Sequence, residues 1–82
     1  MSVYVDYAGR HVRNAVVVSY GRRPSVSVIL NGRVYQGRSY TDRSNAVRAA
    51  KETASWVNAA HWAPVFVRYV IGVGSGGKVV LR

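Results

Sequence analysis

Two kinds of residue are scarce in this 82-residue sequence, which has no cysteine and only three acidic residues. The absence of cysteine excludes disulfides, thiolate catalysis and zinc sites built on cysteine. No apolar run approaches the roughly 20 residues that a membrane-spanning helix needs, and no signal peptide precedes the first expected strand. We therefore expect a soluble, cytoplasmic protein without a membrane partner.

The few groups that could support catalysis or bind a metal are scattered along the chain, at Asp6, His11, Asp42, Glu52 and His61. Asp42 is placed to cap a helix, and Glu52 follows Arg48 at the spacing of a helical ion pair. Asp6 has no evident structural role, but a single carboxylate cannot hold the two metal ions of a nuclease site. The sequence therefore predicts a protein that is not an enzyme and has no metal site, cofactor or small-molecule substrate.

Positive charge dominates the composition. Twelve lysines and arginines oppose the three acidic residues, which gives a formal net charge of +9. Like charges repel one another in a folded domain, so a polyanionic partner accounts for this excess better than the fold does. The basic residues are spread through predicted turns, strands and helix, and this distribution is typical of a folded surface that follows phosphates.

The strongest local signal is Asn31-Gly32, which separates two alternating segments at residues 25–30 and 33–40. Asparagine and glycine tolerate the positive φ angles of a type I′ turn, so this pair predicts a two-residue hairpin loop. The loop length sets the register of the whole hairpin. In that register Ser25 lies opposite Arg38.

One long helix is predicted between Thr41 and His61, where small residues recur at helical spacing. Thr41 or Asp42 is suited to cap its first N–H groups, and Pro64 disfavours helical geometry at the residue before it. The expected buried stripe consists of Ala46, Ala50, Thr53, Val57 and Ala60, flanked by Ala49 and Trp56. We expect Trp56 to contribute most of the buried area.

Four further strand patterns lie on either side of the hairpin and helix, at residues 3–7, 15–20, 65–71 and 78–81. The nearly continuous apolar run at 15–20 is typical of a central strand that is covered on both faces. Strands followed by a helix and more strands are typical of an α+β domain. We therefore predict one small basic domain over residues 1–82, in the order β-β-β-β-α-β-β. Its five or six strands are expected to form a single antiparallel sheet with the helix packed on one face.

The hairpin register gives the two faces of residues 25–40 different side-chain chemistry. The apolar face is expected to lie under the helix and carries Val26, Val28, Leu30 and Tyr35. The opposite face mixes hydroxyl, amide, guanidinium and aromatic groups and carries Ser25, Ser27, Ile29, Val34, Gln36, Arg38 and Tyr40. We expect this second face to be open to a partner.

Residues 28–42 and 46–50 resemble the AP2-type DNA-binding domain and the related arm-binding domain of phage integrases. The pattern of this family is a strand, a turn with Asn/Asp-Gly-Lys/Arg, a strand that ends in Gly-x-aromatic, and an alanine-rich helix. The double-stranded RNA-binding domain is similar over the same region. The AP2-type resemblance implies that the sheet lies in the major groove of DNA, with Gln36, Arg38 and Tyr40 facing outward. It also implies phosphate contacts from Arg22, Arg23, Arg33 and Arg43, and it suggests a phage or mobile-element origin.

Charge, surface pattern and resemblance together favour a non-enzymatic nucleic-acid-binding protein, with double-stranded DNA preferred over RNA. An RNA-binding domain is the alternative within that class. A small protein-interaction module, or an inhibitor that binds an acidic partner, is the alternative outside it. An exposed edge strand could also support a homodimer.

Overall fold

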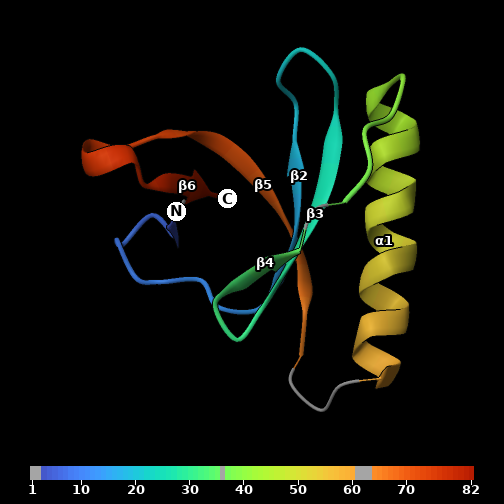
Figure 1. The fold of residues 1–82 in the computed structure, drawn as a ribbon, viewed down its shortest axis with the longest axis horizontal. Coiled ribbons are helices and arrows are strands. Elements are labelled where there is room, and N and C mark those ends of the chain that lie inside the picture. Colours follow the sequence, from blue (N-terminus) through green and yellow to red (C-terminus); the bar gives the residue numbers. More distant parts are fainter. Residues whose placement is uncertain (1–2, 36, 61–63) are drawn as a thin grey trace.

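The computed structural model describes residues 3–35, 37–60 and 64–82, and in this part of the chain one long helix packs on one face of a curled sheet (Figure 1). The helix is α1 (Arg43–Ala60), and the predicted α+β class with a single long helix is confirmed. The strands are β1 (Tyr4–Val5), β2 (Ala15–Ser19), β3 (Ser25–Leu30), β4 (Arg33–Tyr35), β5 (Phe66–Val73) and β6 (Val79–Leu81), with a short 3₁₀ turn, η1 (Ser75–Gly77), between the last two.

The sheet is mixed, so the prediction of a purely antiparallel sheet is wrong. Its spatial order is β1-β6-β5-β2-β3-β4, which differs from the order in the chain. The pairs β2–β3, β3–β4 and β5–β6 are antiparallel, whereas β2–β5 and β1–β6 are parallel. The parallel pairing of β2 with β5 follows from the position of α1, which is about 27 Å long. It returns the chain along the sheet, so β5 starts beside the beginning of β2 and runs in the same direction.

The first core lies between α1 and the sheet. From the helix it contains Ala46, Ala50, Ala54 and Val57, and from the sheet side Val16, Val18, Val26 and Val65. The predicted burial of Ala46, Ala50 and Val57 is confirmed, whereas Ala60 is exposed and Ala54 takes a buried place that was not predicted. The expectation for Trp56 is wrong, because this side chain is 66% exposed. A helix turns by about 100° per residue, so burial of Val57 leaves its neighbour Trp56 at the rim of the stripe.

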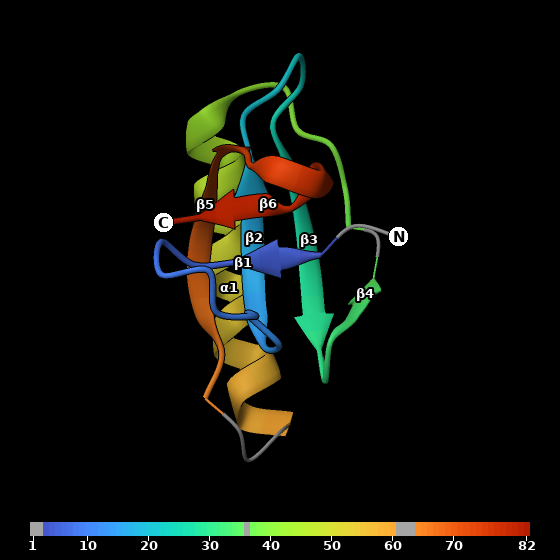
Figure 2. The same cartoon turned by 90° about the vertical axis from the view of Figure 1, so that its left-hand side faces the viewer.

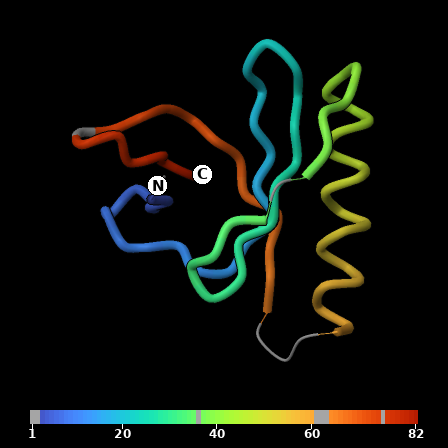
Figure 3. The backbone as a smooth tube through the Cα atoms, in the orientation of Figure 1, coloured from blue at the N-terminus to red at the C-terminus, as the bar shows by residue number. Residues whose placement is uncertain are grey.

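A second core lies on the opposite face of the sheet, because β5 bends. The first half of β5 pairs with β2 and the second half with β6, with a register shift between Val70 and Gly72. The backbone trace shows β5 passing from the foot of α1 to the other side of the sheet (Figure 3). There β6 and β1 cross over β2 and β3 (Figure 2), and Ala15, Val17, Ile29 and Leu81 are fully buried between them. The expected open sheet face is therefore covered at Ile29, whereas Val34 on the same face stays exposed.

The hairpin follows the predicted register only near its turn. Asn31 and Gly32 have φ angles of 53° and 78°, and Val28 pairs with Tyr35 as expected. Further along, Ser25 lies opposite Ser39 instead of Arg38, a shift of one residue. Side chains alternate between faces, so such a shift moves the following side chains to the other face. Tyr40 accordingly packs against the first core, and its predicted place on the outward face is wrong.

A close backbone approach accompanies this shift. Gly37 lies so near the Val26 carbonyl that a β-carbon at position 37 would overlap with the carbonyl oxygen. Only glycine fits at such a contact. Gln36, the residue before it, lies outside the described residues.

Candidate nucleic-acid interface

Four predicted binding residues lie on neighbouring segments around the start of β3, which we call the arginine end: Arg22, Arg23, Arg38 and Arg43. The turn between β2 and β3 carries the first two, and the first turn of α1 lies at the same end (Figure 1). Two backbone hydrogen bonds hold the segments together: Tyr40 N–H donates to the Pro24 carbonyl at 2.8 Å, and Val26 N–H donates to the Arg38 carbonyl at 3.0 Å. All four arginines are exposed.

A cation–π contact joins Arg43 to Tyr20, the residue that follows β2. Its guanidinium carbon lies 4.7 Å from the centre of the Tyr20 ring, which is a cation–π distance. The Tyr20 ring lies 6.1 Å from the Tyr69 ring, and both rings pack against the first core. This contact orders Arg43 beside the turn that carries Arg22, because Tyr20 is only two residues before it.

Asp42 is the acidic residue at the arginine end, and it is used in capping α1. Its Oδ1 accepts the Asn45 N–H at 2.8 Å and the Ser44 hydroxyl at 3.1 Å, which confirms the predicted cap. The hydrogen bond from the Asn45 backbone N–H is the main reason that the pKa of Asp42 lies below the ordinary aspartate value. One carboxylate against four guanidiniums leaves a local excess of positive charge.

Asp6 has a structural role that the sequence did not reveal. Its Oδ1 accepts the N–H groups of Ala8 and Arg10, each at 2.9 Å, and its Oδ2 lies 3.3 Å from the Arg10 guanidinium. These contacts stabilise the turn after β1. They also lower the pKa of Asp6, with the Arg10 backbone N–H as the largest cause.

The other candidate catalytic and metal-binding residues do not come together in the described part of the chain. No three histidine, aspartate or glutamate side chains come together there in a way that could hold a metal ion. Arg48 donates to Asn45 Oδ1 at 2.7 Å, and the expected ion pair with Glu52 is not among the contacts of the described residues. His61 lies outside those residues.

Arg33 is separated from the other predicted site residues. It follows the hairpin turn at the far end of β3, and six residues of strand correspond to about 20 Å. The neighbouring Arg13 was missed by the sequence reasoning. No local pattern brings residue 13 near residue 32, but the Gly32 N–H donates to the Arg13 carbonyl at 3.0 Å.

Aromatic side chains at the arginine end are not presented to solvent as flat surfaces. Tyr20, Tyr40 and Tyr69 are half-buried and pack against the first core. The large exposed rings of the described residues lie elsewhere, at Tyr7, Tyr35, Trp56 and Phe66. The arginine end therefore offers charge and hydrogen-bond donors, and offers little ring surface for stacking on bases.

Neither a search for a membrane-spanning helix nor comparison with known proteins assigns a function to this chain. In the described part of the chain, the helix α1 is not long and apolar enough to cross a membrane. No protein-family model, no curated protein and no solved structure matches this chain.

Proposed function

We propose that this protein is a non-enzymatic nucleic-acid-binding domain that contacts the phosphates of duplex DNA through its arginine end. The observation that carries the proposal is that Arg22, Arg23, Arg38 and Arg43, all exposed, lie on neighbouring segments joined by backbone hydrogen bonds, with Asp42 as the acidic residue on the same segments. Guanidinium groups donate well-oriented hydrogen bonds to phosphate oxygens, and their charge displaces counterions from DNA. The net charge of +9 supports the same partner.

Two features favour phosphate contacts over recognition of bases. The sheet face proposed for the major groove by the AP2-type resemblance carries the buried Ile29 beneath β1 and β6. The rings at the arginine end are half-buried, whereas proteins that prefer single strands stack bases on aromatic side chains. A duplex backbone bound largely without regard to sequence is therefore the preferred target, with duplex RNA as the nearest alternative.

Titration of labelled duplex DNA, single-stranded DNA and duplex RNA over a series of salt concentrations tests this proposal. We expect the tightest binding to duplex DNA and a steep dependence on salt. The double variant Arg22→Ala, Arg23→Ala should reduce the slope of log K against log salt by about 1.8, because each lost phosphate contact removes roughly 0.9. At 0.1 M salt its affinity should fall at least about tenfold.

Lys78→Ala with Arg82→Ala is the matched control, since it removes the same charge from exposed positions on either side of β6. The control should change the slope much less than the variant at the arginine end. An equal change in both would mean that the charge acts diffusely and would overturn the assigned site. Absence of binding to all three nucleic acids at low salt would overturn the function and leave an acidic protein partner as the better explanation.

A further inference from the structure

A second pair of exposed arginines, Arg13 and Arg33, lies at the other end of β3, and we call it the distal pair. The Gly32 N–H donates to the Arg13 carbonyl at 3.0 Å, and the Asn31 N–H donates to Asn14 Oδ1 at 3.1 Å. These bonds hold the segment that carries Arg13 against the hairpin turn that precedes Arg33. The backbone positions of both arginines are therefore set by the fold.

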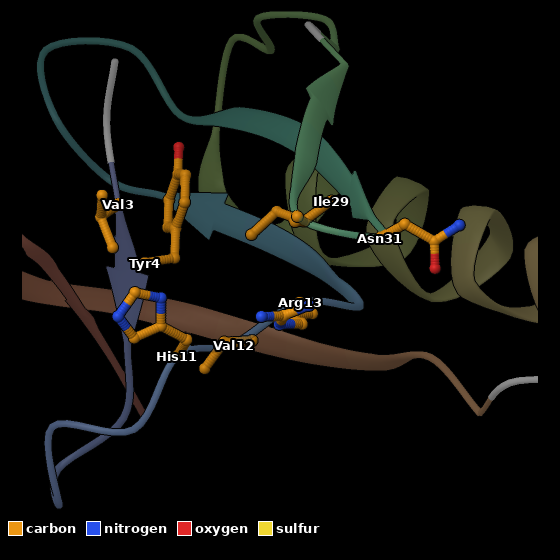
Figure 4. Close-up of a pocket in the computed structure, with 8 residues that line it drawn as sticks. Val3, Tyr4, His11, Val12, Arg13, Ile29 and Asn31 are labelled. Atoms are coloured by element: carbon orange, nitrogen blue, oxygen red, sulfur yellow. The ribbon is translucent and has the colours of Figure 1, made fainter.

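Arg13 of the distal pair lines a hollow that the first core does not use. Val3, Val12 and Ile29 supply apolar lining, and Tyr4, His11, Arg13, Asn31 and Gly32 complete it. Figure 4 shows the Arg13 side chain between the His11 side and the Asn31 side of this hollow. None of the acidic residues lines the hollow. An anionic partner thus meets a recessed, positively charged surface here.

The turn between β2 and β3 and the turn between β3 and β4 lie at opposite ends of β3 (Figure 2). The six residues of β3 separate them by about 20 Å, and the longest dimension of the domain is 32 Å. That separation exceeds the width of the major groove, about 12 Å. The arginines at the two ends of β3 are therefore too far apart to contact the same phosphate group.

The edge of the sheet between the two ends does not suit a continuous phosphate track. There β4 presents Val34 and Tyr35, which are 39% and 49% exposed. These side chains are uncharged and largely apolar, so a single duplex laid along this edge would cover apolar surface without gaining phosphate contacts. Two separate contacts fit the charge distribution better than one long contact.

We infer that the distal pair is a second phosphate-binding site, and that one copy of the protein bridges two DNA duplexes. This inference rests on the proposed function, because it assumes that the arginine end binds the first duplex. It assigns a second DNA duplex as the partner of Arg13 and Arg33, which are not needed to bind the first duplex.

A capture experiment tests the bridge directly. One duplex is immobilised, increasing amounts of protein are added, and retention of a second, fluorescent duplex is measured together with binding of the protein itself. We expect retention to rise and then fall as protein increases, because excess protein occupies each duplex separately. Arg13→Ala with Arg33→Ala should still bind the immobilised duplex but should reduce retention at 0.1 M salt at least about tenfold. The control Lys78→Ala, Arg82→Ala should retain the second duplex nearly as well as wild type.

The outcomes separate the two proposals. Binding of the immobilised duplex without retention of the second would overturn the bridge and leave the proposed function intact. Retention that survives in Arg13→Ala, Arg33→Ala would also overturn it, because the bridge would then come from self-association or diffuse charge. Absence of binding to the first duplex would overturn both. Far-UV circular dichroism of each variant checks the fold, which these exposed side chains should not alter.

Discussion

Asn58 connects the end of α1 to the residue just before β5, and its replacement is the most informative test of the fold. Its Oδ1 accepts the Val65 N–H at 2.6 Å, and its Nδ2 donates to the Val65 carbonyl at 2.8 Å. Val65 is only 1% exposed and belongs to the first core. Both hydrogen-bonding groups of one core residue thus depend on a single side chain.

The expected destabilisation by Asn58→Ala follows from three terms. Each lost hydrogen bond reduces the free energy of unfolding by roughly 0.5–1.5 kcal/mol, and more where the remaining partner is kept from water. Alanine regains about 0.6 kcal/mol because it favours a helix more than asparagine does. Asn58 is itself exposed, so water can partly replace the lost contacts. We therefore expect a net loss of about 1–2 kcal/mol.

Urea unfolding followed by circular dichroism measures this loss. With a slope near 1 kcal/mol/M, which is typical of a small domain, the midpoint should fall by about 1–2 M. Ser55→Ala is the matched control, because Ser55 is exposed one turn earlier on the same helix and should leave the midpoint unchanged or slightly higher. Equal midpoints for Asn58→Ala and Ser55→Ala would refute the reasoning that this side chain holds the crossover to β5.

Two further predictions concern the register shift and the helix cap. Gly37→Ala should destabilise the protein strongly, because its β-carbon would overlap with the Val26 carbonyl, whereas Gly21→Ala, which meets open space, should unfold at nearly the wild-type urea concentration. Asp42 has a folded-state pKa below its ordinary value, so its stabilisation is complete above that value and is lost as the pH falls through the lower one. Asp42→Ala should therefore unfold at a lower temperature at pH 7, and its melting temperature should fall less than that of wild type on acidification. Parallel pH profiles for the two proteins would contradict this account.

Interactions between residues close together in the sequence determined the hairpin turn, the helix cap and the buried stripe of the helix. The Asn31-Gly32 turn follows from the tolerance of these residues for positive φ, and Asp42 caps α1 because a short carboxylate side chain reaches the N–H group three residues on. The helix stripe around Ala46, Ala50 and Val57 follows from helical periodicity. Each of these features depends on residues close together in the sequence, so the pattern of residue types was enough to predict it.

Tertiary structure alone decided which surfaces are open. The bend of β5 carries β6 over β2 and β3, which buries Ile29 on the face that the hairpin register had left free. The contact of Gly37 with Val26 accompanies a one-residue shift, which turns Tyr40 toward the core. The same packing brings Arg22, Arg38 and Arg43 onto neighbouring segments around the start of β3. These outcomes depend on contacts between residues far apart in the chain, whose free energy is gained only when both partners are folded, so no local pattern records them.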